Sequence, residues 1–171
     1  MKRTAITFIT LAAACIVLGS CAKNTPSEGM QLLSDASCDF TLEVPSDWEI
    51  SYTSSMLAAY DTADKTNVTA FSIGLQEEMG ADDFWEDRYK PNFEDTFGTM
   101  NVNAKEETKL SGVIARHVFY TVDMGEDSFN CQTVICVRMG NVYMVTFTAT
   151  PETYDSHTEE FEKILSSYKF K

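Results

Sequence analysis

The sequence has few basic residues and lacks the short motifs of common active sites. Its 171 residues include 13 Lys and Arg against 26 Asp and Glu, a formal net charge of −13. This balance argues against nucleic-acid binding, which depends on Lys and Arg neutralising phosphates, and against a polybasic contact with anionic lipid. The sequence contains no G-x-S-x-G, H-E-x-x-H, C-x-x-C or phosphate-cradling glycine-rich motif. We therefore expect no catalytic function, although the many acids leave a hydrolase pair open.

Long hydrophobic runs are scarce as well. The 14 residues from Ala5 to Leu18 are uncharged and follow Lys2 and Arg3. A membrane-spanning helix needs about 20 apolar residues, so this run is more typical of a signal-peptide core. It ends in Leu18-Gly19-Ser20-Cys21, which resembles the lipobox of bacterial lipoproteins. In that family the cysteine thiol carries diacylglycerol and the chain is cut before it, which implies a lipid anchor at Cys21.

These features predict a tethered, extracytoplasmic protein. We expect residues 1–20 to be a signal peptide, residues 21–29 a lipidated N-terminus with a flexible polar spacer, and residues 30–171 one domain. Loss of Lys2 and Arg3 leaves 11 basic residues against 26 acids, a net charge of −15. The expected location is the cell membrane or the outer membrane. Ala22 after the cysteine resembles lipoproteins sent outward, but the type of envelope stays open.

Three cysteines lie in the expected domain: Cys38, Cys131 and Cys136. An extracytoplasmic location permits a disulfide, but an odd number leaves at least one thiol over. Cys131 and Cys136 lie five positions apart in a strand-like run, so they should point to opposite faces and not pair with each other. A bond from Cys38 to either of them stays open. Buried free thiols are the favoured interpretation.

Hydrophobic patterning indicates a single α+β domain with a mostly antiparallel sheet flanked by helices. Apolar and polar residues alternate from Phe40 to Val44, as in a half-buried strand. Further strands are expected at residues 55–60 and 68–75, around a turn at 61–65, and at residues 105–110, 113–124, 128–139 and 142–148. The tight turns between the last three make them antiparallel neighbours.

Two helices are expected. Over residues 81–97, the aromatic residues Trp85, Tyr89, Phe93 and Phe97 recur every four positions, which predicts an amphipathic helix bent or interrupted at Pro91. Core packing is the favoured role of this stripe, and a sugar or lipid groove is the alternative. The second helix should have Thr150 as its N-cap and Pro151 at its first position. One face of it carries Tyr154, Phe161, Ile164, Leu165 and Tyr168.

Two stretches resemble PsbP-like domains. The first is FTLEVPSDWEI, from Phe40 to Ile50, and the second runs from Asn141-Val142-Tyr143 to the closing Ser166-Ser167-Tyr168-Lys169-Phe170. The resemblance covers about residues 30–171. It implies an antiparallel sheet between helices, an α-β-α sandwich, as in the superfamily that also includes Mog-type Ran-binding proteins. Because binding is the common theme of that superfamily, the resemblance implies an interaction module without catalytic residues.

Six carboxylates gather between Glu77 and Asp87, and oxygen-rich clusters of this kind attract Ca²⁺ or Mn²⁺. The candidate ligands are Asp82, Asp83, Glu86 and Asp87. A solvated acidic face is the favoured interpretation, so no cofactor is expected. The two histidines, His117 and His157, are expected to be a packed residue and a surface residue. A metal pair at His157, beside Glu159 and Glu160, is the less favoured alternative. We therefore predict a monomer that docks another envelope protein, with binding of a small ligand or divalent cation as the alternative.

Overall fold

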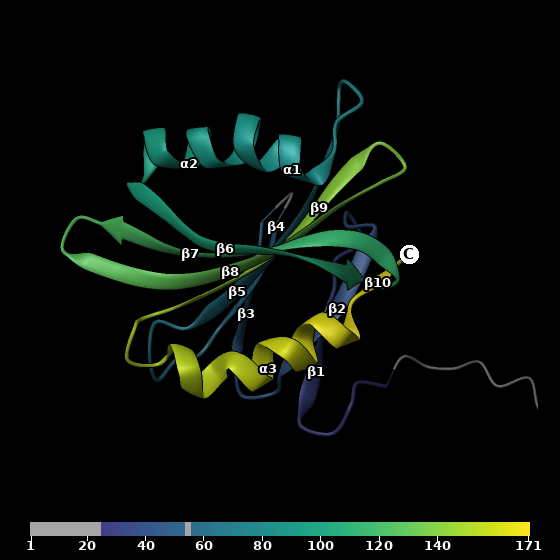
Figure 1. Cartoon of the computed structure of the whole chain (residues 1–171). Helices are drawn as coiled ribbons and strands as arrows, with labels where there is room; N and C mark the ends of the chain where they lie inside the picture. The colour runs from purple at the N-terminus through teal and green to yellow at the C-terminus, as the bar shows by residue number, and fades with distance from the viewer. Residues whose placement is uncertain (1–24, 54–55) are drawn as a thin grey trace, which may run out of the picture.

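Seven strands form one antiparallel sheet at the centre of the molecule (Figure 1). The structure is a computed structural model that describes residues 25–53 and 56–171. The strand order is β3-β4-β5-β9-β8-β7-β6, and each neighbouring pair is antiparallel. The strands are β3 (Glu49–Tyr52), β4 (Met56–Tyr60), β5 (Asn67–Gly74), β6 (Thr99–Leu110), β7 (Val113–Met124), β8 (Asp127–Arg138) and β9 (Asn141–Ala149).

One face of this sheet is covered by a helix and a small second sheet. Helix α3 (Tyr154–Ser167) buries Phe161 and Ile164, and Phe161 stacks on Phe147 of β9 with ring centroids 5.2 Å apart. The second sheet has the order β1-β2-β10, with β1 (Met30–Leu33), β2 (Phe40–Pro45) and β10 (Lys169–Phe170). The apolar residues of β2 complete a core between the two sheets and α3. The strand expected to be half-buried from Phe40 to Val44 is instead buried at every position except Glu43, because β2 lies between β1 and β10 and against α3.

A broken helix lies over the opposite face. It consists of α1 (Ala81–Phe84), a π-helical turn η1 (Trp85–Tyr89) and α2 (Lys90–Thr96), and we call these residues the α1–α2 segment. In the π-turn the Lys90 N–H donates to the carbonyl of Trp85, five residues back. Proline has no N–H and its ring clashes with the carbonyl four residues earlier. The wider turn before Pro91 accommodates that ring, so the interruption predicted at this proline is present just before it.

Alternation along the inner strands supplies both cores. On β7, Ala115 and His117 face α3, whereas Val118, Tyr120 and Val122 face the α1–α2 segment. Both sets are buried, because helices cover the sheet on both sides. The predicted fold class, a mostly antiparallel sheet in an α-β-α sandwich, is confirmed.

Some boundaries differ from the prediction. Helix α3 begins at Tyr154, not at Pro151 with Thr150 as N-cap, because residues 150–153 form a turn in which Thr150 accepts the N–H groups of Thr153 and Tyr154. Strand β6 begins at Thr99, six residues before the expected strand. The short strands β1, β3 and β10 have four, four and two residues, too few for a periodic pattern.

The predicted signal peptide, the lipobox and Cys21 lie outside the described residues. Within the predicted spacer, Ser27 donates its N–H to the carboxylate of Glu43, and the carbonyl of Gly29 accepts from Ser46, so these two residues contact β2 or its end. Among the helices of residues 25–53 and 56–171, none has the length and hydrophobicity to cross a membrane.

Candidate functional site

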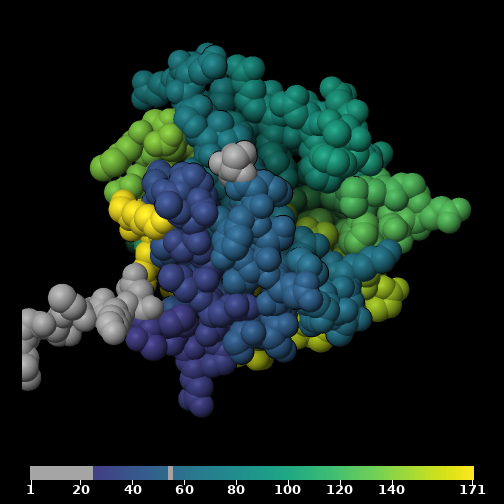
Figure 2. Space-filling view, turned by 180° about the vertical axis from the view of Figure 1, so that it is seen from behind, coloured from purple at the N-terminus to yellow at the C-terminus, as the bar shows by residue number. Residues whose placement is uncertain are grey.

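A long hollow of the described surface lies between β5 and the α1–α2 segment. It has a volume of about 830 Å³ and is lined mainly by apolar side chains. These come from β5 and the loop after it (Phe71, Ile73, Leu75, Met79) and from the α1–α2 segment (Phe84, Tyr89). An ion pair of Arg88 with Glu77, 2.5 Å long, lies at its wall. Figure 2 shows this side of the molecule, with β3–β5 in blue and the α1–α2 segment in teal above them.

A second hollow of about 260 Å³ continues along the same helix. Tyr89 lines both hollows, and Phe93 and Phe97 line the second one. Beneath them, β5 supplies the row Asn67, Thr69, Phe71 and Ile73 across the two hollows. The six residue-to-residue steps from Asn67 to Ile73 span about 20 Å. We call the two hollows together the β5 groove, and its length and apolar walls suit an extended ligand.

The aromatic stripe predicted from the sequence is divided between core and groove. Trp85 is fully buried, and its ring packs 5.2 Å from those of Tyr89 and Tyr120. Tyr89 and Phe93 are half-buried, whereas Phe97 is 59% exposed. The expected core role therefore holds fully for Trp85, whereas Tyr89 and Phe93 pack at the margin of the core. Phe97, at the end of the helix, packs on Phe93 with ring centroids 5.1 Å apart.

Hydroxyl groups form the floor under Tyr89. The Tyr120 hydroxyl lies 3.0 Å from Thr133 Oγ1, which lies 2.9 Å from Thr146 Oγ1, and all three groups are buried. Burial raises the pKa of Tyr120 well above its ordinary value. The chain of hydroxyls is therefore neutral at physiological pH, and it supplies hydrogen-bonding groups rather than charge at the floor.

The carboxylates predicted as cation ligands do not converge. Asp82 binds Arg116 through both oxygens, at 2.9 and 2.8 Å, Glu86 pairs with Lys105, and Asp83 accepts from the backbone N–H of Gly80. These contacts point the carboxylates to separate partners along the helix. The arrangement matches a charged outer face with ion pairs, and the cation site at Asp82, Asp83, Glu86 and Asp87 stays a prediction.

Cys38, Cys131 and Cys136 are buried free thiols. Cys131 belongs to the core beneath the α1–α2 segment, whereas Cys38 and Cys136 belong to the core beneath α3. The two strand cysteines therefore point to opposite faces, as their spacing indicates. Burial raises the pKa of Cys131 to about 11 and that of Cys136 to about 12, which makes both thiols poor nucleophiles.

The two histidines lie in different surroundings. His117 is buried, hydrogen-bonded through Nε2 to Gln132 at 2.8 Å and stacked on Phe119. Burial lowers the pKa of His117, so the ring is neutral at physiological pH. This agrees with the packed histidine expected at this position.

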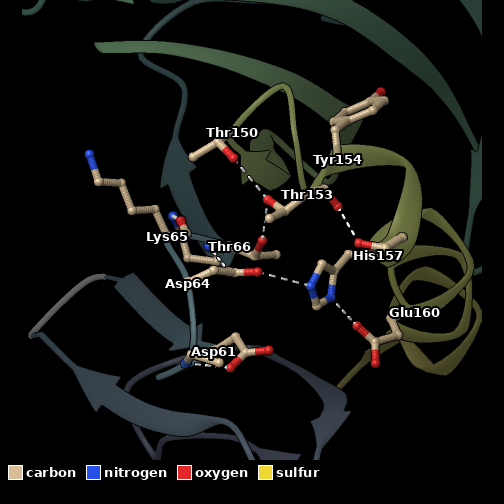
Figure 3. A network of polar contacts seen from close by, with 12 residues as sticks. Asp61, Asp64, Lys65, Thr66, Thr150, Thr153, Tyr154, His157 and Glu160 are labelled. Atoms are coloured by element: carbon tan, nitrogen blue, oxygen red, sulfur yellow. Dashed lines mark hydrogen bonds and ion pairs between the residues drawn. The ribbon is translucent and has the colours of Figure 1, made fainter. Parts of the chain in front are cut away.

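His157, which was expected at the surface, is half-buried between carboxylates (Figure 3). Its Nε2 lies 3.2 Å from Asp64 Oδ2 and its Nδ1 lies 2.5 Å from Glu160 Oε2. Partial burial alone would lower the pKa of His157, but the hydrogen bonds and charges of Glu160 and Asp64 raise it. Asp64 could not be recognised as a partner of His157 from the sequence, because 93 residues separate the two and no local spacing connects them.

Comparison with known proteins identifies the family. A family model described as PsbP-like protein matches residues 19–170. The chain belongs to the PsbP-like family. The resemblance seen at residues 40–50 and 141–170 is thus confirmed, and it extends over almost the whole chain. No curated protein matches the sequence.

Solved structures agree on the fold of this PsbP-like chain. The solution structure of cyanobacterial PsbP from Synechocystis sp. PCC 6803 has a TM-score of 0.67 at 15% identity, covering 90% of this chain and 99% of that one. PA94 from Pseudomonas aeruginosa, a protein of unknown function, has a TM-score of 0.54 at 18% identity, covering 78% and 92%. LpqN of Mycobacterium tuberculosis, involved in cell envelope biogenesis, has a TM-score of 0.52 at 12% identity, covering 82% and 90%. At such identities the similarity establishes the fold alone.

Proposed function

We propose that this PsbP-like chain is a membrane-anchored, extracytoplasmic lipoprotein that acts as a non-catalytic accessory module. Its β5 groove docks a basic segment of another envelope protein that carries apolar side chains. The observation that carries the proposal is the groove itself. Its first hollow has a volume of about 830 Å³, with apolar and aromatic walls and an ion pair at its side. Concave, mostly apolar sites with a few polar groups are typical binding sites.

Charge around the groove supports a basic partner. Glu77 lines the first hollow just after β5, Glu78 follows it in the chain, and both are exposed. The outer face of the α1–α2 segment adds Asp83, Glu86 and Asp87, also exposed. The whole chain is also acidic, with a formal net charge of −13. Such a field accelerates association with a basic partner and weakens as salt rises.

Two observations support the location. The run from Ala5 to Leu18 and the lipobox resemblance at Cys21 support export and lipid anchoring. The fold is shared with LpqN, a protein involved in cell envelope biogenesis. Two acyl chains anchor a protein far more firmly than one, since each buried CH₂ contributes about 0.8 kcal/mol.

Docking is tested by site-specific photocrosslinking of the full chain in cells. A photoreactive amino acid replaces Ile73, which is 48% exposed inside the groove, and in a matched control it replaces Ile114, which is 66% exposed outside it. We expect one dominant crosslinked protein from position 73 that is absent from position 114 and decreases in Glu77→Gln/Glu78→Gln. Equal products from both positions, or none from position 73, would refute docking at the groove.

Anchoring is tested separately with Cys21→Ala. We expect the variant to stay unprocessed or to leave the detergent phase, since the thiol is the predicted point of lipid attachment. Detergent partitioning and mass unchanged from the native protein would show that Cys21 is not lipidated. This result would leave the groove proposal standing, because the two experiments measure different parts of the chain.

A further inference from the structure

The loop between β4 and β5 and the first turns of α3 bring three metal-binding side chains together (Figure 3). One ligand atom each from Asp61, Asp64 and His157 lie within 4.8 Å of one another, all three residues being half-buried. These residues lie apart from the β5 groove and do not line it. In the described part of the chain, this is the one group of His, Cys, Asp or Glu side chains with such spacing.

The loop fixes both aspartates by local hydrogen bonds. Asp61 Oδ1 accepts the N–H of Ala63 at 2.8 Å, and Asp64 Oδ1 accepts the N–H of Thr66 at 2.6 Å. One oxygen of each carboxylate is thereby held by the backbone, and the second oxygen of Asp64 faces Nε2 of His157 at 3.2 Å. The Thr66 hydroxyl also lies 3.2 Å from that of Thr153, which joins the loop to the residue preceding α3.

The imidazole is oriented from its other side. Glu160, one turn along α3, lies 2.5 Å from Nδ1 of His157, and Nε2 lies 3.2 Å from Asp64 Oδ2. With Nδ1 donating to Glu160, a metal that binds Nε2 takes the place of the proton between Nε2 and Asp64. Histidines that bind metals nearly always donate their second ring N–H to a carboxylate or carbonyl, which fixes the tautomer and makes the free nitrogen a better ligand. Glu160 therefore gives His157 the arrangement of a metal ligand.

The negative charge of this cluster has little compensation. Three carboxylates, those of Asp61, Asp64 and Glu160, surround a single imidazole. Lys65, the nearest basic residue in sequence, extends away and pairs with Asp127 at 2.9 Å. Among residues 25–53 and 56–171, no lysine or arginine forms an ion pair with the three carboxylates. The His157 and Asp64 side chains are only 15% and 22% exposed, so water screens this charge incompletely.

We propose that Asp61, Asp64 and His157 bind one divalent transition-metal cation, such as Zn²⁺, and that Glu160 orients His157 for it. One imidazole nitrogen and two carboxylate oxygens suit Zn²⁺ and its neighbours, whereas Ca²⁺ takes six to eight oxygens. Three protein ligands leave a further coordination position to water. The cation ties the β4–β5 loop to α3 and neutralises the facing carboxylates.

The proposal is tested by titrating Zn²⁺ into the reduced full chain and measuring heat and thermal stability. Asp61→Asn and His157→Gln remove one ligand each, and Asp87→Asn, on the α1–α2 segment, is the acidic control. We expect one Zn²⁺ per chain, at least tenfold weaker binding in both ligand variants, and no change in the control. Glu160→Gln should weaken binding by roughly 10- to 100-fold, as for other residues that orient a ligand.

Two further measurements keep the result decisive. Co²⁺ replaces Zn²⁺ to detect ligation by the free cysteines, because thiolate ligands give intense charge-transfer absorption and histidine with carboxylate does not. In Asp61→Asn the amide oxygen should still accept the Ala63 N–H, so the loop should stay folded. If His157→Gln does not fold, the affinity of Asp61→Asn for Zn²⁺ therefore decides the proposal. Absence of binding at millimolar Zn²⁺, binding unchanged in Asp61→Asn, or a thiolate spectrum would each overturn the proposal.

Discussion

Truncation of Trp85 tests the division of the aromatic stripe between core and groove. Trp85 is fully buried, and its Nε1 has no hydrogen-bond partner within the described residues, so Trp85→Ala removes packing without breaking a hydrogen bond. Burying an aromatic side chain removes about 150–250 Å² from water, and truncating one in a core costs about 3–5 kcal/mol. This is a large part of the roughly 5–15 kcal/mol that stabilises a typical domain.

Phe97→Ala is the matched comparison at the other end of the stripe. Because Phe97 is 59% exposed, its truncation should cost less than about 1 kcal/mol. Urea unfolding followed by circular dichroism gives both free energies. In the crosslinking assay, Phe97→Ala should lower the yield at position 73, since Phe97 lines the groove. Equal losses of stability in the two variants would refute the division of the stripe.

Three further predictions follow from burial and backbone geometry. Burial lowers the pKa of His117 below its ordinary 6.5, so the unfolded chain binds the proton more readily and stability falls as the pH drops through that value. Urea unfolding at neutral and at mildly acidic pH measures this effect. Between the two pH values, the free energy of unfolding should fall less in His117→Gln than in the native chain. An equal fall in both proteins would contradict the prediction. The raised pKa values of Cys131 and Cys136 predict that iodoacetamide leaves both thiols unmodified until the chain is unfolded. Peptide mass spectrometry detects the modification. Rapid modification of the folded chain would contradict the burial of these thiols. Gly98 has a φ of +153° and a Cβ there would lie 2.1 Å from the carbonyl oxygen of Asp123, so Gly98→Ala should lower the free energy of unfolding by more than about 1 kcal/mol. Gly125→Ala, also at positive φ but in open space, should cost less; equal costs would show that β7 gives way without penalty.

The sequence predicted those parts of the fold that depend on local pattern. The turn glycines Gly112, Gly125 and Gly140 separate β6 to β9, and all three have positive φ, as tight hairpin turns require. The break before Pro91 was likewise predictable from the missing N–H. Strands such as β10 were not, because two residues carry no periodicity and their pairing partner Phe40 lies 130 positions away.

Sites built from distant segments escaped the sequence analysis for the same reason. The acids from Asp82 to Asp87 suggest a cation site because they are close together in sequence. The helix, however, directs Asp82 and Glu86 toward separate basic partners. Asp61 and Asp64 look like ordinary turn residues until α3 places His157 against them. Acidic residues that are adjacent in sequence raise the charge density along one helix. A metal-ligand set instead needs side chains that converge from several helices, strands or loops.

The two faces of the sheet are built for different tasks. On one face, α3 has 14 residues and stacks Phe161 on Phe147, and β2 completes the core. On the other face, α2 has seven residues and buries none of them completely. A helix this short is not stable alone, so α2 depends on the packing of Phe84 and Trp85 before it and of its own Phe93 against the core. The wall of the β5 groove is therefore packed most deeply at Phe84 and Trp85 and becomes more exposed along α2 towards Phe97. Glu94, which accepts the Met100 N–H, joins this end of the helix to β6.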